Sequence, residues 1–152
     1  MIKKSAGIVA YRTKKNLQVF LVHPGGPFFR NKDAGVWSIP KGEYAEEENP
    51  LIAAKREFFE ETGFELNGDF IELQPVKQKS GKTVFAWAIA FDLDEQKIVS
   101  NTFSIEWPPK SGKMKDFPEI DKAGWFTVEE AKEKMISAQF GLVEDLLKKV
   151  SL

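Results

Sequence analysis

Residues 42–64, GEYAEEENPLIAAKREFFEETGF, constrain this chain most, because three glutamates recur there at helical spacing. On a helix, Glu57, Glu60 and Glu61 share one face, since positions three and four apart are neighbours. Carboxylates this close repel one another unless a cation lies between them. A hard divalent ion with oxygen ligands is the natural counter-charge, so the stretch predicts a helix that carries a metal site.

Local signals also favour a helix in this stretch. Asn49 suits the N-cap, Pro50 suits the first helical position, and Gly63 can end the helix in a left-handed conformation. Ile52 and Phe59 fall roughly opposite the glutamates. We therefore expect the helix to bury the side that carries Ile52 and Phe59 and to present its acidic side to a cation.

The wider pattern resembles the signature of the Nudix hydrolases. That signature is a glycine, five free positions, a glutamate, seven free positions and then R-E-U-x-E-E-x-G-U, where U is bulky and apolar. Gly42, Glu48 and the run that starts at Arg56 meet all nine fixed positions, with Phe58 and Phe64 at the two U positions. A solvated acidic face would explain an isolated glutamate cluster, but the fixed spacing of the whole pattern favours the resemblance.

The resemblance implies a metal centre that holds Mg²⁺ or Mn²⁺. Glu60 and Glu61 would be the main ligands, and Glu57 would be a further ligand or the general base. A main-chain carbonyl just before the helix commonly joins the metal shell in this family, and Lys41 or Gly42 occupies that point here. The implied chemistry is hydrolysis of a phosphoric anhydride by a metal-activated water.

The resemblance also implies two supporting roles. Arg56 would pair with Glu48 and hold the preceding loop against the helix. An acidic residue shortly before a Trp-Phe pair often completes the metal site or acts as base in this family, and Glu119 occupies that position here. Glu106 and Asp116 are alternatives for the same role.

Residues 23–35, HPGGPFFRNKDAG, predict a loop because they are rich in glycine and proline. Two adjacent aromatic residues cannot easily both face a core from a loop, so we expect Phe28 or Phe29 to stack on a ligand ring. His23 is either a catalytic group or, as is commoner for a lone histidine, a solvated or hydrogen-bonded loop residue. Lys41 ends a Trp-x-x-Pro-Lys run that resembles Nudix enzymes acting on dinucleoside polyphosphates or oxidised nucleotides, and we expect it to contact a phosphate.

Residues 101–118, NTFSIEWPPKSGKMKDFP, predict a long loop, because they show no regular hydrophobic period. Trp107 stands beside two prolines and is a candidate shelf for a nucleobase. Lys110, Lys113 and Lys115 are candidate phosphate contacts, although lysines also serve simply to solvate a loop.

The remaining segments predict a sheet with helices on both sides. Residues 5–11 and 17–22 favour a hairpin, and residues 36–42 favour a short strand. Strands are also expected over residues 70–78 and 83–93, the second of them covered on both faces. A strand ending at Trp125 and Phe126, a helix capped by Thr127 and Glu130, and a C-terminal helix follow. The resemblance implies the Nudix α/β/α sandwich, with a mixed β-sheet between helices, as one domain over residues 1–152 whose signature spans residues 42–64.

Composition excludes several classes of function. The net charge of −1 gives no field for coating a nucleic-acid polymer, and the absence of cysteine excludes disulfides and thiol chemistry. The apolar run at the start of the sequence is too short for a signal peptide. We therefore expect a cytoplasmic protein without a membrane span, whose partner is a small-molecule nucleotide substrate.

Three functions are compatible with these observations. The favoured one is a Mg²⁺-dependent pyrophosphohydrolase of nucleoside diphosphate-linked substrates, with a dinucleoside polyphosphate such as diadenosine tetraphosphate as the preferred substrate. The alternative enzyme is a MutT-like pyrophosphohydrolase of oxidised nucleoside triphosphates. A non-catalytic nucleotide-sensing module is the third, and the complete glutamate set argues against it.

Overall fold

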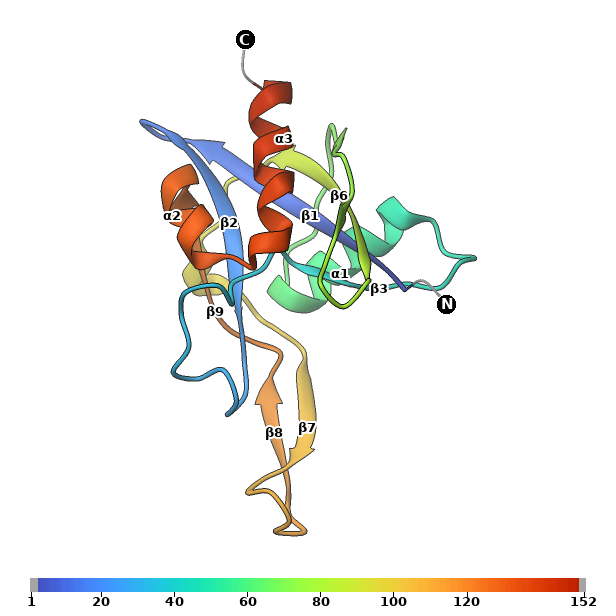
Figure 1. The fold of residues 1–152 in the computed structure, drawn as a ribbon, viewed down its shortest axis with the longest axis vertical. Coiled ribbons are helices and arrows are strands. Elements are labelled where there is room, and N and C mark those ends of the chain that lie inside the picture. Colours follow the sequence, from blue (N-terminus) through green and yellow to red (C-terminus); the bar gives the residue numbers. More distant parts are fainter. Residues whose placement is uncertain (1–2, 151–152) are drawn as a thin grey trace.

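A mixed seven-stranded sheet forms the centre of the molecule, which a computed structural model describes over residues 3–150 (Figure 1). Its strands follow the order β4-β6-β1-β2-β9, with β3 also paired to β1 and β5 to β6. The pair β1–β6 is parallel and the other pairs are antiparallel. The seven strands are β1 (Lys4–Thr13), β2 (Leu17–Pro24), β3 (Lys41–Glu43), β4 (Ile71–Glu72), β5 (Val76–Lys77), β6 (Thr83–Ala90) and β9 (Ile120–Thr127).

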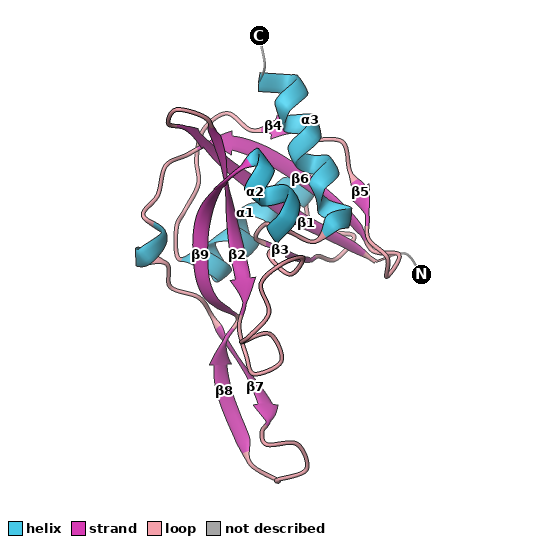
Figure 2. Ribbon diagram, turned by 60° about the vertical axis from the view of Figure 1, so that its left-hand side comes forward, coloured by secondary structure: helices cyan, strands magenta, loops and turns pink. Residues whose placement is uncertain are grey.

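Helices cover both faces of this sheet (Figure 2). Helix α1 (Pro50–Thr62) lies on one face, and α2 (Val128–Lys134) and α3 (Phe140–Val150) lie on the other. The short 3₁₀ turns η1 (Glu95–Lys97) and η2 (Ser137–Gln139) complete the helical elements. Strand β1 alternates between the two cores, because Ile8 packs toward α1 and Val9 toward α3. The predicted α/β/α sandwich with a mixed sheet is therefore confirmed.

Strand β1 pairs with two different strands along one of its edges, and this arrangement determines where the site lies. Residues 5–7 of β1 pair with β3, whereas residues 11–13 pair with β2. Between the two partners, the Ile8 N–H donates to the Pro40 carbonyl at 3.1 Å, and Val22 bridges to Ser38. The segment that leaves β2 therefore returns to the sheet directly before β3, and it brings Lys41 and Gly42 next to α1.

Several elements match the sequence expectations, and three expected strands are shorter. Residues 36–42 form only isolated bridges before β3 begins at Lys41, and β6 ends at Ala90. The β1–β2 hairpin, the capping box between Thr127 and Glu130 and the C-terminal helix are all present. The strand expected over residues 70–78 is reduced to β4 and β5, because Pro75 between them has no N–H for a ladder. Strand β6 is covered only in part on the α1 side, where Phe85 and Trp87 are half-buried.

Residues 101–118 are a β-hairpin, so the predicted loop is wrong. Strands β7 (Thr102–Glu106) and β8 (Met114–Pro118) pair in a separate two-stranded sheet that projects from the body (Figures 1 and 2). Only Phe103, Ile105 and Phe117 are half-buried within these strands. The alternation in β7 covers only five residues and β8 carries one half-buried residue, so the hydrophobic period is too short to predict two strands. Within residues 3–150, no helix is long and apolar enough to cross a membrane.

Candidate active site

Helix α1 has the ends that its sequence predicts. The side-chain oxygen of Asn49 accepts a hydrogen bond from the Ile52 N–H at 3.1 Å, and Pro50 occupies the first turn. Gly63 adopts a left-handed conformation with φ of 81°, and its N–H donates to the Phe59 carbonyl. A side chain would be strained at that φ, so the glycine fixes where the helix stops.

The buried side of α1 differs from the prediction. Ile52 and Phe59 are 61% and 48% exposed, whereas Glu57 and Glu61 are only 9% and 8% exposed. The helix instead buries two adjacent rows of residues four positions apart: Ala53, Glu57 and Glu61, and Ala54, Phe58 and Thr62. The alanines let α1 approach β1 closely, and this approach draws the two glutamates against the sheet.

Gly42 is required by the Glu57 carboxylate rather than by a tight turn. It lies in β3 opposite Ala6 and does not have a positive φ, so its backbone conformation does not require a glycine. A Cβ atom at Gly42 would lie 2.1 Å from Cδ of Glu57. The missing side chain therefore makes the space in which the buried carboxylate rests on the strand backbone.

Arg56 joins three of the carboxylates. Its Nε and Nη2 donate to the two carboxylate oxygens of Glu48, both at 3.0 Å. Its Nη1 donates to Glu57 at 2.8 Å and to Glu60 at 3.2 Å. The bidentate pair fixes the preceding loop to α1, and the remaining bonds hold two helix carboxylates in place. The hydrogen bond from Arg56 holds the pKa of Glu48 below its usual range.

Burial sets the electrostatics of the inner glutamates. It raises the pKa of Glu61 to about 8, with help from the negative charges of Glu57 and Glu119, while Lys41 acts in the opposite direction. Burial also raises the pKa of Glu57, which the hydrogen bond from Arg56 opposes. Holding these carboxylates close together therefore costs electrostatic free energy, and a bound cation would remove that cost.

Lys41 is a half-buried ammonium beside this cluster. Burial lowers its pKa, and the positive charge of Lys82 adds to the effect, while Glu61, Glu43 and Glu57 oppose it. Within residues 3–150, no carboxylate lies within ion-pair distance of its Nζ atom. The group is therefore positioned to bind an anion that enters the site.

Glu119 is the acidic residue outside α1 that belongs with the cluster. Burial and the charge of Glu60 raise its pKa, and its own charge acts on Glu57 and Glu61. A hydrogen bond holds the Glu119 backbone in position, because the Glu119 carbonyl accepts from the Gly25 N–H at 2.7 Å.

The two alternatives to Glu119 are engaged on the hairpin. Glu106 accepts from the backbone N–H groups of Lys110 and Gly112, at 2.9 and 3.2 Å. Asp116 accepts from the Ser104 hydroxyl. Both carboxylates therefore stabilise the hairpin itself, and of the three acidic residues only Glu119 acts on the pKa values of the α1 glutamates.

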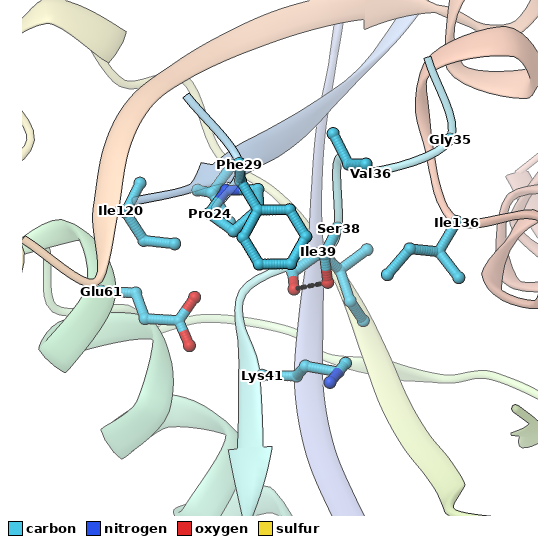
Figure 3. Close-up of a pocket in the computed structure, with 11 residues that line it drawn as sticks. Pro24, Phe29, Gly35, Val36, Ser38, Ile39, Lys41, Glu61, Ile120 and Ile136 are labelled. Atoms are coloured by element: carbon cyan, nitrogen blue, oxygen red, sulfur yellow. Dashed lines mark hydrogen bonds between the residues drawn. The ribbon is translucent and has the colours of Figure 1, made fainter. Parts of the chain in front are cut away.

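An apolar pocket of about 330 Å³ opens beside Glu61 and Lys41 (Figure 3). The ring of Phe29 lies across it, and Lys41 and Glu61 lie together at one end (Figure 3). Its other lining residues come from β2, the segment before β3, the start of β9 and the turn after α2: Val22, Pro24, Gly35, Val36, Ser38, Ile39, Ile120 and Ile136. The size is at the lower end of the range for small-ligand sites and suits one base with part of its sugar.

The aromatic loop and the hairpin contact each other. Phe28 is 61% exposed and meets Trp107 edge-to-face, with their ring centroids 5.6 Å apart. Phe103 packs on the backbone of Gly26, where a Cβ atom would lie 2.8 Å from the ring. Phe29 thus lies in the pocket, and Phe28 and Trp107 form an exposed pair outside it.

The hairpin tip lies away from the carboxylates. In Figures 1 and 2 the turn between β7 and β8 lies beyond the body at the far end of the arm, whose base meets the end of α1 where the Asn101 N–H donates to the Glu60 carbonyl. Lys110 and Lys113 belong to this turn, and Lys115 belongs to β8. The structure therefore brings Lys41 to the glutamates but not these three exposed lysines.

His23 is a buried strand residue rather than part of a loop. It is fully buried at the end of β2, where Nδ1 bonds to Asp121 and Nε2 to the Lys32 carbonyl, both at 2.7 Å. His23 therefore ties the aromatic loop to β9 and does not reach the pocket.

The pocket lining is what the sequence analysis missed. Val36, Ile39 and Ile136 are apolar residues of the kind that fill any core, and nothing in their spacing marks them as ligand contacts. This pocket differs from the two cores only because the fold brings Phe29 close to Lys41. Among the uncharged lining residues, a sequence signal existed for Phe29 alone, as one of two adjacent aromatic residues in a loop.

The donor set fits a hard divalent cation. Glu57, Glu60, Glu61 and Glu119 supply carboxylate oxygens only, which is the ligand chemistry that Mg²⁺ and Mn²⁺ prefer. Within residues 3–150, no three acidic or histidine side chains are already arranged to hold one ion. One reason for this arrangement is that Arg56 donates hydrogen bonds to two of the same carboxylates, Glu57 and Glu60.

Comparison with known proteins agrees with this architecture. The sequence model of the NUDIX domain family matches residues 1–146. The chain belongs to the Nudix family. It is a hydrolase that acts on phosphoric anhydrides, and Nudix enzymes generally use divalent metal ions. No curated protein sequence matches the chain.

Solved structures share the Nudix fold at low sequence identity. The binary complex of a Caenorhabditis elegans Ap4A hydrolase superposes with a TM-score of 0.67 at 18% identity, covering 97% of this chain and 98% of that one. The NUDIX domain of Shewanella oneidensis NrtR, complexed with ADP ribose, has a TM-score of 0.67 at 14% identity, covering 99% and 90%. A Nudix hydrolase from Mycobacterium smegmatis, RenU, has a TM-score of 0.60 at 16% identity, covering 98% and 88%.

Proposed function

We propose that this Nudix protein is a Mg²⁺- or Mn²⁺-dependent pyrophosphohydrolase of nucleoside diphosphate-linked substrates, with a dinucleoside polyphosphate as the favoured substrate. The observation that carries the proposal is the direct opening of an apolar pocket onto Glu61 and Lys41. A nucleoside held against Phe29 places its phosphates next to the ammonium and the carboxylates. The similarity in fold to an Ap4A hydrolase supports the same substrate class.

Glu57, Glu60 and Glu61 would hold the metal, with a carbonyl of Lys41 or Gly42 as a further ligand. A bound divalent ion supplies charge neutralisation on the phosphate oxygens and lowers the pKa of an attacking water. Arg56 keeps Glu57 and Glu60 oriented through its hydrogen bonds.

Two side chains act directly on the substrate in this proposal. The Lys41 ammonium donates hydrogen bonds to a phosphate oxygen, and its partial burial strengthens that contact. Glu119 accepts a proton from the attacking water, because burial and the charge of Glu60 raise its pKa and with it its affinity for a proton. Glu57 is the second candidate for the base, and its hydrogen bond to Arg56 favours its charged form.

A dinucleoside polyphosphate has a second nucleoside, and the pocket has room for only one. The exposed pair of Phe28 and Trp107 lies outside the pocket, where the loop after β2 meets the start of the turn that follows β7, and it offers aromatic surface for the other base. This two-part arrangement is the reason for preferring a dinucleoside polyphosphate to a nucleoside triphosphate.

The decisive experiment is a substrate panel with Mg²⁺. We expect hydrolysis of diadenosine tetraphosphate with a kcat/KM well above that of nucleoside triphosphates and nucleotide sugars, measured by chromatography of the products. Reaction in ¹⁸O-labelled water identifies the phosphorus that is attacked. Faster hydrolysis of oxidised nucleoside triphosphates would support the MutT-like alternative instead. Nucleotide binding without hydrolysis of any compound would support the sensing module.

A further inference from the structure

We infer that the pocket recognises a nucleobase by shape and stacking alone, so that this enzyme does not distinguish adenine, guanine and oxidised guanine by their hydrogen-bonding edges. The inference rests on the proposed function, since it assumes that a base enters the pocket beside Glu61 and Lys41. It adds that the pocket does not bind the hydrogen-bonding edge of the base. It therefore argues against a role in clearing oxidised nucleotides.

Six of the backbone N–H donors of the wall are already used within the protein. A base edge can be read by main-chain N–H groups only where these groups are free. Six lining residues donate their N–H groups to internal acceptors at 2.8–3.2 Å: Val22 to Ser38 O, Ser38 to Val22 O, Gly35 to Glu133 O, Ile39 to Gln139 Oε1, Ile120 to Ser100 Oγ and Ile136 to Trp37 O.

The uncharged polar side chain in the lining is also used. The Ser38 hydroxyl donates to the Ile39 carbonyl at 2.7 Å, which Figure 3 marks, and accepts from Nε2 of Gln139 at 3.1 Å. Gln139 is fully buried, and its Nε2 also donates to Gln78 at 3.0 Å. Turning the hydroxyl toward a ligand would leave buried amide groups without partners, so the network holds it in place.

Charge is confined to the phosphate end of the pocket. Lys41 and Glu61 are the two charged lining residues, and Figure 3 shows both at the same side, below the ring of Phe29. Beyond Ser38, the remaining lining side chains are apolar. A base that enters from this end therefore meets the aromatic ring and aliphatic groups, which contact every base alike.

The consequence for specificity follows from the chemistry of the bases. Oxidised guanine differs from guanine by a carbonyl at C8 and an N–H at N7, and adenine differs by its exchanged donors and acceptors. A site that bonds such groups discriminates by about 10⁴–10⁵-fold, whereas an apolar pocket discriminates by about 10²-fold at most. We expect differences within about tenfold, because none of the polar groups described above is directed at a base edge.

The test uses two matched series of ligands that differ only in the base. The first measures kcat/KM with Mg²⁺ for symmetric dinucleoside tetraphosphates of adenine, guanine and unsubstituted purine. The second measures Kd by calorimetry for AMP, GMP, 8-oxo-GMP and purine riboside monophosphate. We expect each series to span less than about tenfold, with unsubstituted purine equal to adenine or better. A loss of more than about 100-fold for unsubstituted purine, or a similar preference for 8-oxo-GMP, overturns the inference.

The same two series separate this inference from the proposed function. Uniform Kd values without hydrolysis of any tetraphosphate would reject the proposed function and support the inference. No binding of any monophosphate would reject the inference, because the pocket would then not accept a base.

Variants of the wall give a second, independent readout. Phe29→Ala should weaken binding of all bases by the same factor, about tenfold, and Phe29→Leu should weaken it less. Ile136→Asn adds a free amide to the wall and should create a preference of at least about tenfold for one base. Val36→Thr adds a hydroxyl at nearly constant volume and serves if Ile136→Asn does not fold. A base-dependent effect of Phe29→Ala contradicts the inference.

Discussion

The site has one wall of carboxylates on α1 and an opposite wall of apolar side chains, and the two differ in how they are packed. The wall on α1 packs the carboxylates of Glu57 and Glu61 against the sheet, where burial raises the pKa of both. The opposite wall consists of apolar side chains such as Val36 and Ile136, and six of its backbone N–H groups donate to acceptors within the protein. The first wall lowers the stability of the metal-free fold, whereas the second is an extension of the core.

This difference separates reactivity from selectivity. Buried carboxylates held near one another bind a cation strongly, because the ion removes a repulsion that the fold imposes. An apolar wall adds affinity in proportion to the contact area and distinguishes ligands mainly by size. Substitutions in the first wall should therefore change the rate and the pH dependence of stability, and those in the second should change affinity. The predictions below test that division, from the largest expected effect to the smallest.

The largest effect should come from Glu61→Gln. We expect kcat to fall by about 10²–10³-fold or more, because the substitution removes a charge from the proposed metal site at nearly constant volume. Steady-state kinetics with saturating Mg²⁺ measure the loss, and circular dichroism verifies the fold. Glu144→Gln, an exposed position in α3, is the matched control and should keep full activity. Wild-type kcat in the Glu61→Gln variant would show that the proposed metal site on α1 does not take part in the reaction.

The same variant should stabilise the metal-free protein at alkaline pH. A carboxyl whose pKa rises from 4.5 unfolded to about 8 folded favours folding only while it is protonated. Wild-type stability in EDTA should therefore decline as the pH rises from about 4.5 to above 8, by roughly 2–4 kcal/mol. Urea unfolding between pH 5 and 9 measures this decline.

Two comparisons test the origin of that decline. Glu61→Gln should flatten the pH profile, whereas Glu144→Gln should leave it as in the wild type. Adding Mg²⁺ to the wild type should restore stability at pH 8, because the ion offsets the same negative charge. Parallel pH profiles for wild type and Glu61→Gln would show that the buried carboxylate is not the source.

A smaller effect is expected from Gly42→Ala. The new Cβ atom would overlap the carboxylate of Glu57 and displace it from β3. We expect kcat to fall by about 10–100-fold, since small displacements of catalytic groups have effects of this size. Gly141→Ala in α3 is the matched control, because its Cβ atom meets only Val76 Cγ1 at 3.2 Å. Equal activity of the two variants would mean that Glu57 need not rest on the strand.

The sequence predicted the first wall far better than the second. The spacing of Glu57, Glu60 and Glu61 and the caps of α1 indicated the helix and its carboxylates directly. It did not indicate which face is buried, because burying Glu57 depends on Gly42, a residue from a different element. The preference of Ile52 for a core was overridden by close packing of the alanine rows.

The second wall and the hairpin depend on contacts that no local pattern records. Ile39 and Ile136 lie almost a hundred residues apart, and their shared pocket exists only after the sheet forms. Strand β7 alternates over only five residues and β8 has one half-buried residue, so no hydrophobic period is long enough to indicate the arm, although Phe103 and Phe117 pair across it with their rings 6.1 Å apart. Pairing between strands, not burial, forms this element.

The smallest effect is expected at the hairpin tip. Lys110 and Lys113 lie in the turn at the far end of the arm, so the double variant Lys110→Gln/Lys113→Gln should change kcat/KM by less than about twofold at 0.15 M salt, where distant charges are screened. Lys41→Gln is the informative comparison, because its ammonium lies at the pocket and should raise KM by at least about tenfold. If the tip variant instead raised KM as much as Lys41→Gln does, the hairpin would have to fold over the site during binding. Phosphate recognition would then no longer be local to β3.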